Sequence, residues 1–270
     1  MFALKLLLSP LLIGLVSLAG RRWGPSIGGW LVGLPLTSGP VVFLLALGQG
    51  TTFAANASQG TLLGLISVCS FCLAYCWCSF RLNWLGSLLA GWLAFFLSTA
   101  LLERVHIALL LTFASVIAFT ALVLAILPRR RKQMDILPAP SWETPLRMVF
   151  AATFVLLITG ISGVIGPQLS GLLTPFPMFA SILGAFTHRF QGAEAARQSL
   201  SGVVIGSFTS SIFLLAVAGT IEHYGIALAF ILALLAAMLT HGISLWLMRR
   251  NNLQGEGEHR PCSQNTKLRG

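Results

Sequence analysis

Residues 166–215, GPQLSGLLTPFPMFASILGAFTHRFQGAEAARQSLSGVVIGSFTSSIFLL, decide the fold, because an earlier part of the chain repeats their pattern. The earlier copy, residues 24–73, is GPSIGGWLVGLPLTSGPVVFLLALGQGTTFAANASQGTLLGLISVCSFCL, and a constant offset of 142 residues aligns the two copies without a gap. Most coincident positions hold glycine, proline or alanine. These residues govern backbone geometry, so the pattern predicts two copies of one structural unit.

The composition around these copies indicates a membrane protein. The chain has 270 residues, of which 56% are hydrophobic and 9% charged, and its mean hydropathy is +0.86. Soluble domains carry about 25% charged residues. So few charges cannot cover a soluble surface of this size, and apolar runs of about 20 residues recur along the chain. We therefore predict an all-α polytopic membrane protein.

Apolar length predicts nine transmembrane helices. They lie near residues 3–20, 26–47, 60–80, 84–101, 106–127, 148–165, 168–186, 198–218 and 224–248. The offset of 142 maps the first four onto the last four and leaves the fifth without a counterpart. A single intervening span turns the second unit over, so the predicted architecture is a 4 + 1 + 4 inverted repeat.

The basic residues predict the orientation of the chain. If the N-terminus lies outside, all of the 17 Lys and Arg residues except Lys5 and Arg104 fall on the cytoplasmic side. The positive-inside rule therefore favours an N-out, C-in topology. It also explains the net charge of +10 without a nucleic-acid partner. The partners that we expect are the lipid bilayer and a small molecule or ion, and further copies of the chain remain an open alternative.

Five segments follow from this topology. They are a first four-helix repeat (1–105), a connecting transmembrane helix (106–127), a cytoplasmic linker (128–147), a second, inverted four-helix repeat (148–250) and a disordered cytoplasmic tail (251–270). Pro138, Pro140 and Pro145 are expected to keep the linker extended. The polar composition of the last segment is typical of disorder.

Three motifs in the second repeat carry a family resemblance. They are SGLLTPFPMFA (170–180), GAEAAR (192–197) and GISLW (242–246). They resemble motifs of the small four-span GlpM-like proteins of bacterial inner membranes, over residues 148–250. Residues 3–101 share the resemblance only through the internal repeat, where Thr52 and Ala55 replace Glu194 and Arg197. The resemblance implies a helical fold and a bacterial inner-membrane location, and it implies no biochemical activity.

Prolines in the second and seventh spans mark the candidate substrate site. A proline removes an intrahelical hydrogen bond, so Pro35 and Pro40 should interrupt one span and Pro175 and Pro177 the other. Paired broken helices in inverted repeats commonly form transporter sites, although kinked packing helices are an equal alternative. The hydroxyls beside the breaks belong to Thr37, Ser38 and Thr174.

Two further features lie within spans. His241, in the ninth span, is a candidate proton relay or a neutral hydrogen-bonded side chain. Gly60 and Gly64, repeated as Gly202 and Gly206, form GxxxG patterns that favour close helix packing. We expect the third and eighth spans to cross at these four glycines.

The chain lacks sequence patterns of an enzyme. No phosphate-binding loop, HExxH or GxSxG motif occurs, and we predict no catalytic residue and no cofactor. Cys69, Cys72 and Cys76 share one helical face, where apolar packing is favoured over a soft-metal site. Two functions remain open: a secondary transporter or permease of a small, perhaps anionic solute, and a non-transporting component that assists envelope or polysaccharide assembly.

Overall fold

The computed structural model describes residue 35 and residues 38–105, 107–127 and 143–257, and this part of the chain is helical, without a β-strand. Its helices are α3 (Ser38–Gln49), α4 (Thr51–Cys78), α5 (Trp84–Leu102), α6 (Leu109–Ile126), α7 (Glu143–Leu173), α8 (Met178–Gln191) and α9 (Ala193–Gly257). Two of them bend at a glycine with positive φ, namely α7 at Gly166 and α9 at Gly225. The all-α prediction is confirmed for the described residues.

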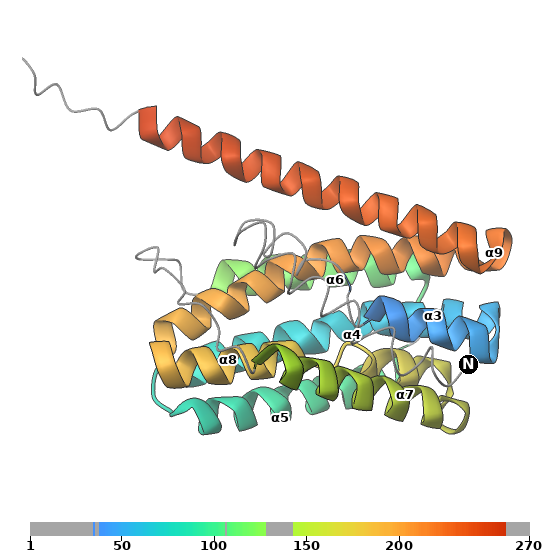
Figure 1. Cartoon of the computed structure of the whole chain (residues 1–270), viewed down its shortest axis with the longest axis horizontal. Helices are drawn as coiled ribbons and strands as arrows, with labels where there is room; N and C mark the ends of the chain where they lie inside the picture. Colours follow the sequence, from blue (N-terminus) through green and yellow to red (C-terminus); the bar gives the residue numbers. More distant parts are fainter. Residues whose placement is uncertain (1–34, 36–37, 106, 128–142, 258–270) are drawn as a thin grey trace, which may run out of the picture.

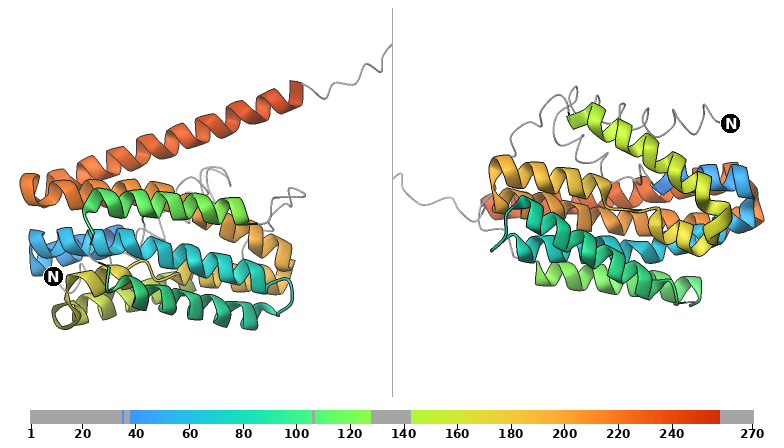
Figure 2. Two further views of the ribbon diagram at one scale, coloured as in Figure 1. Left: turned by 180° about the vertical axis from the view of Figure 1, so that it is seen from behind. Right: turned by 90° about the horizontal axis from the view of Figure 1, so that it is seen from below.

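Helix α4 is the centre of the molecule. It packs against α3, α5, α6, α7 and α9, as Figure 1 shows. In its most apolar stretch 67% of the residues are buried, against 22% in α5, α6 and α9. Figure 2 shows α6 and the first half of α9 side by side, whereas the second half of α9 diverges from the bundle. The helix that carries the first GxxxG pattern is therefore the one surrounded by protein.

The surrounding helices present apolar side chains outward. Leu93 on α5 is 62% exposed and Leu110 on α6 is 72% exposed. Such a surface would be costly in water and is accommodated by lipid. Four described helices are long and apolar enough to cross a membrane: α4, α5, α6 and α9 over Ala193–Thr240. The chain is an integral membrane protein.

Two glycine turns have nearly identical backbones. Gly50, between α3 and α4, has φ 92° and ψ 172°, and Gly192, between α8 and α9, has φ 92° and ψ 171°. These angles are accessible essentially to glycine alone. Each glycine donates its N–H to the carbonyl four residues earlier, at 3.1 and 3.2 Å respectively. The two positions are related by the offset of 142 that aligns the sequence copies.

The two turns lie at opposite ends of α4. The Gly50 turn directly precedes α4, so it lies at the N-terminal end of that helix. The Gly192 turn lies at the other end, because Arg197 reaches Ser79, the residue that follows α4, at 3.2 Å. Figure 1 shows the α3–α4 turn and the α8–α9 turn on opposite sides of the bundle. We call these the Gly50 end and the Gly192 end; the α5–α6 turn and Gly166 lie at the Gly50 end.

Several predicted boundaries were wrong. Helix α4 begins at Thr51 instead of near 60, because the Gly50 turn starts the helix within a polar stretch that hydropathy excludes. Helix α7 begins at Glu143, inside the expected extended linker, and Pro145 lies in its first turn, where no backbone N–H is required. Helix α9 continues to Gly257, so residues 251–257 are helical instead of disordered. The rest of the expected tail lies outside the described residues.

The complete topology stays a prediction. The first predicted span and much of the second fall within residues 1–34, which are outside the part that the structure describes. The described helices therefore do not test the nine-span count, the 4 + 1 + 4 arrangement or the N-out, C-in orientation.

Candidate functional site

The predicted break in the seventh span is the gap between α7 and α8, at Thr174–Pro177. The two prolines of this segment have no N–H to donate. Met178 donates its N–H to the Phe176 carbonyl at 2.7 Å, a tighter turn than a helix contains, and Ser181 donates to the Pro177 carbonyl at 2.7 Å to restart the helix. The end of α7 and the start of α8 are thus two separate helical segments on either side of the break.

An aromatic cluster fills the space at this break. The ring of Phe176 lies 5.4 Å from Phe95, 6.0 Å from Phe96 and 6.2 Å from Trp92 between centroids. The Thr174 hydroxyl is buried and donates to the Ser170 carbonyl at 2.6 Å, so it already has a partner. Side chains therefore pack around the break, and Pro175 and Pro177 within it are buried.

The corresponding part of the second span is described only in part. Helix α3 begins at Ser38, which is buried, and Gly39 donates its N–H to the carbonyl of the buried Pro35 at 2.8 Å. Pro40 lies in the first turn of α3, where a proline fits. Whether the second span is interrupted before Ser38 stays a prediction, because residues 26–34, 36 and 37 lie outside the described part of the chain. Thr37 lies outside the described residues.

The glycine pairs occupy two different environments. Gly60 and Gly64 lie where α4 crosses α7, and a Cβ added to them would lie 2.6 and 2.8 Å from carbonyl oxygens of α7. A Cβ at the exposed Gly202 would meet no atom within 4 Å. The first pair therefore faces α7. Helices α4 and α9, which carry the two GxxxG patterns, do pack against each other, but Gly60, Gly64 and Gly202 do not form that contact.

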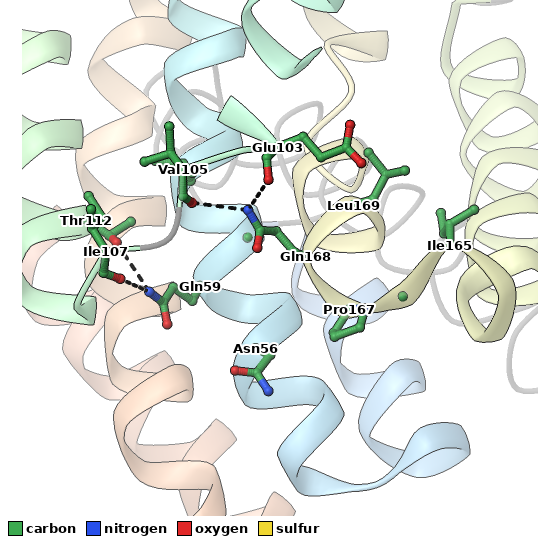
Figure 3. Close-up of a pocket in the computed structure, with 13 residues that line it drawn as sticks. Asn56, Gln59, Glu103, Val105, Ile107, Thr112, Ile165, Pro167, Gln168 and Leu169 are labelled. Carbon is green, nitrogen blue, oxygen red and sulfur yellow. Dashed lines mark hydrogen bonds between the residues drawn. The ribbon is translucent and has the colours of Figure 1, made fainter. Parts of the chain in front are cut away.

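A pocket with several polar side chains lies at the Gly50 end, between α4, the α5–α6 turn and the Gly166 kink of α7 (Figure 3). Its volume of about 690 Å³ is within the range of small-molecule sites, about 300–1,000 Å³. Its lining residues are Asn56, Gln59, Gly60, Leu63, Glu103, Val105, Ile107, Thr112, Ile165, Gly166, Pro167, Gln168 and Leu169. The pocket begins where α7 bends, about two turns from the Thr174–Pro177 break.

Two glutamines hold the α5–α6 turn over this pocket. Gln168 donates from Nε2 to the carbonyls of Glu103, at 2.8 Å, and Val105, at 3.2 Å. Gln59 donates from Nε2 to the carbonyl of Ile107 at 2.6 Å. Figure 3 shows that the side-chain oxygens of both glutamines make no hydrogen bond with the residues drawn. The pocket therefore has a fixed rim and offers amide oxygens as acceptors.

The charge of the pocket is neutral to acidic. Asn56 adds an exposed amide with both a donor and an acceptor, and Glu103 is the one ionisable side chain among the described lining residues. The described lining contains no lysine, arginine or histidine. A neutral or cationic polar group would find hydrogen-bond partners in these amides and this carboxylate.

Sequence reasoning missed this site. It did not single out Asn56, Gln59 or Gln168, which precede or begin the spans predicted near 60–80 and 168–186. The signal was present as amide side chains at helix starts in an otherwise apolar chain. His241 lies on α9, as predicted, but nothing is described of its side chain.

A second polar cluster lies at the Gly192 end, and we call it the arginine cluster. It consists of Tyr75, Ser79, Phe80, His188, Glu194 and Arg197. Arg197 donates to the Ser79 hydroxyl at 3.2 Å and to the Glu194 carboxylate, and its guanidinium lies 4.2 Å from the centre of the Phe80 ring. One side chain of α9 therefore holds the end of α4.

His188 completes this cluster. Its Nδ1 lies 3.3 Å from the Tyr75 hydroxyl, which can donate to it when the imidazole is neutral. Partial burial, and next the positive charge of Arg197, lower the pKa of His188 below its ordinary value of 6.5. The imidazole is thus neutral near pH 7, and the fixed charge of the cluster is that of the Arg197–Glu194 pair.

No protein-family model, no curated protein and no solved structure matches this chain. What the fold defines is the class, an integral membrane protein of packed helices.

Proposed function

We propose that the protein is a multi-pass membrane permease for a small polar solute, which binds in the pocket at the Gly50 end. The observation that carries this proposal is the pocket of about 690 Å³ beside a helix that is kinked at Gly166 and interrupted again at Thr174–Pro177. Non-helical backbone inside membrane proteins is tolerated chiefly where protein or a water-filled cavity surrounds it. Interrupted helices commonly form the solute sites of secondary transporters.

The proposed architecture is the 4 + 1 + 4 inverted repeat, oriented N-out, C-in in a bacterial inner membrane. The matching angles of Gly50 and Gly192, together with their positions at opposite ends of α4, support it. In this topology the pocket opens outward. The GlpM-like relationship of residues 148–250 is part of the same proposal, since its motif residues Gly192, Glu194 and Arg197 form one turn and one ion pair.

The solute that we propose is neutral or cationic. The described lining residues supply amide groups and the carboxylate of Glu103, which favour a neutral or cationic solute over the anionic solute suggested by helix dipoles alone. Ser170 lies just beyond Gln168 along α7, and no described residue forms a hydrogen bond with its buried hydroxyl. An unpaired buried hydroxyl costs about 1–3 kcal/mol, so a water molecule at Ser170 would stabilise it.

The aromatic packing at the break supports the second candidate, a non-transporting component of an envelope or polysaccharide assembly system. Phe176 and its aromatic neighbours occupy the place where a continuous polar path would run. From Gln168 to Thr174 the path would cover about 9 Å along the helix axis. Under this alternative the pocket is a surface feature, and the α7–α8 break serves packing.

A flux measurement distinguishes the two candidates. Purified protein is reconstituted in liposomes and tested with panels of neutral, cationic and anionic small solutes. We expect uptake of a neutral or cationic solute, and we expect Asn56→Leu to reduce it about tenfold, the factor that corresponds to one lost hydrogen bond. Asn56 is suited to this test because, unlike Gln59 and Gln168, it does not tether the turn.

The matched control is Gln198→Leu. Gln198 is equivalent to Asn56 by the offset of 142, lies on α9, and is not among the residues that line the pocket. Uptake should be unchanged in this variant. Absence of flux for every solute class, or equal losses in the two variants, contradicts the permease and leaves the assembly role as the better account.

A further inference from the structure

A second cavity has a chemistry opposite to that of the pocket. It is a groove of about 520 Å³ between α5, α7 and α8, and apart from Thr153, Ser181 and Arg189 its lining is aliphatic and aromatic. The Thr153 hydroxyl donates to the Val149 carbonyl at 3.0 Å, and the Ser181 hydroxyl accepts from Trp92 Nε1 at 2.9 Å. Because these polar groups are already paired, the groove favours an apolar occupant.

The groove runs along one face of α8. Met178, Ile182, Ala185 and Arg189 succeed one another at helical spacing along it. From Met178 to Arg189 the helix rises about 17 Å. Since the hydrocarbon core of a bilayer is about 30 Å thick, the groove spans about one leaflet.

One end of the groove is aromatic and basic. Trp84, the first residue of α5, and Arg189 both line it at the Gly192 end. Arg189 is exposed, its guanidinium lies 5.9 Å from the centre of the Phe190 ring, and it forms no ion pair with a described residue. Tryptophan and arginine are typical of the level of lipid head groups. In a bilayer this arrangement would place the apolar part of the groove within one leaflet and the exposed charge of Arg189 at its head-group end.

We propose that this groove binds one anionic phospholipid. An acyl chain lies along α8 between α5 and α7, and the phosphate is bound by Arg189, which is a suitable donor for phosphate oxygens. The site is independent of the pocket, because the two share no lining residue. It is therefore expected whether or not the protein transports a solute.

The test uses the full chain in lipid nanodiscs and native mass spectrometry with phosphatidylglycerol and phosphatidylethanolamine as probes. The wild type should retain one phosphatidylglycerol in preference to phosphatidylethanolamine. Arg189→Gln should reduce that preference about fivefold, the effect expected for one basic residue at an anionic surface. Arg104→Gln is the control, because Arg104 is an exposed arginine at the Gly50 end, outside the groove.

A second variant tests the apolar part. Ala185→Trp fills the groove and should abolish retention of either lipid; if this variant does not run as a monodisperse species in gel filtration, Ala185→Leu replaces it. Equal retention of the two lipids by the wild type, or equal effects of Arg189→Gln and Arg104→Gln, overturns the proposal. Undiminished retention in the filled variant overturns it as well.

Discussion

The turns at Gly50 and Gly192 share a backbone and differ in nearly every charged side chain. Their φ and ψ angles agree to within 1°, and both lead from a shorter helix into a longer one. Around Gly192 the chain places His188, Glu194 and Arg197, whereas the positions equivalent by the offset hold Ala46, Thr52 and Ala55. The difference separates two requirements: glycine is needed for the path of the chain, and the charged residues are needed at one end only.

The comparison has a physical basis in the membrane. Positive charge is favoured on the cytoplasmic side, so a unit that occurs in both orientations should carry its basic residues at different places in each copy. The Gly192 end has Arg81, Arg189 and Arg197, while the described residues of the Gly50 end include Arg104. The two turns are therefore the best places to test the proposed inversion.

The largest expected effect is the all-or-none labelling of the two turns. In a cysteine-free chain, Gln49→Cys should react with a membrane-impermeant maleimide in intact cells, whereas Gln191→Cys should react only after permeabilisation. The reason is that the proposed topology places the two positions on opposite faces of the membrane. Reaction of both positions under the same condition would contradict the inverted repeat, and a cysteine in the 103–105 turn provides the outer-face control.

The second prediction compares equivalent glycines of the two GxxxG patterns. Gly60→Ala would bring a Cβ to 2.6 Å from the Gln168 carbonyl oxygen, a backbone atom that cannot easily move, and should lower the free energy of unfolding by about 3 kcal/mol. Gly202→Ala should be close to neutral, because the added Cβ meets no atom within 4 Å. Thermal or denaturant unfolding in detergent measures both. An equal loss in Gly202→Ala would mean that the second copy makes an equally close crossing.

Much of the fold was predictable because hydropathy and glycine spacing act locally. The helical class, the breaks around Pro177 and the start of α5 at Trp84 follow from apolar length and from the missing proline N–H. The partner of Gly60 was not predictable, because close approach requires a small residue but does not say which helix approaches. The face of α4 that carries Gly60 packs against Gly171 of α7 and not against the second GxxxG pattern.

The candidate site was less predictable than the fold. Prolines marked the break correctly, but whether a break encloses water depends on side chains distant in sequence, here Trp92 and Phe95 against Phe176. The pocket depends on Gln59 and Gln168 reaching carbonyls of the α5–α6 turn, contacts across 48 and 65 residues of sequence. No local sequence pattern predicts hydrogen bonds between residues so far apart in the chain.

The third prediction tests the shared backbone of the turns. Gly50→Ala and Gly192→Ala should each lower the free energy of unfolding by about 2 kcal/mol, within the range for a side chain forced into a region of φ and ψ that is essentially glycine-only. Gly48→Ala is the control, since Gly48 is helical and a Cβ there meets no atom within 4 Å. Unfolding midpoints at one detergent concentration provide the measurement. A large difference between the two turns would mean that their backbones are not equivalent.

The smallest expected effect is a pH dependence confined to the Gly192 turn. The pKa of His188 is lowered from 6.5 by burial and then by the charge of Arg197, so the folded protein resists a proton that the unfolded chain accepts. Its contribution to stability is therefore complete above pH 6.5 and declines as the pH falls through 6.5 towards the lower pKa of the folded state. Arg197→Gln removes one cause, so the imidazole should titrate closer to 6.5, as NMR of the ring would show.

Ala46 occupies the equivalent position, and hydrogen exchange at the Gly50 turn should follow only the intrinsic pH dependence of the amides. If His188 titrates identically in the wild type and in Arg197→Gln, Arg197 is not a cause of the lowered pKa. If hydrogen exchange at the Gly50 and Gly192 turns shows the same excess pH dependence, a group other than His188 causes that dependence.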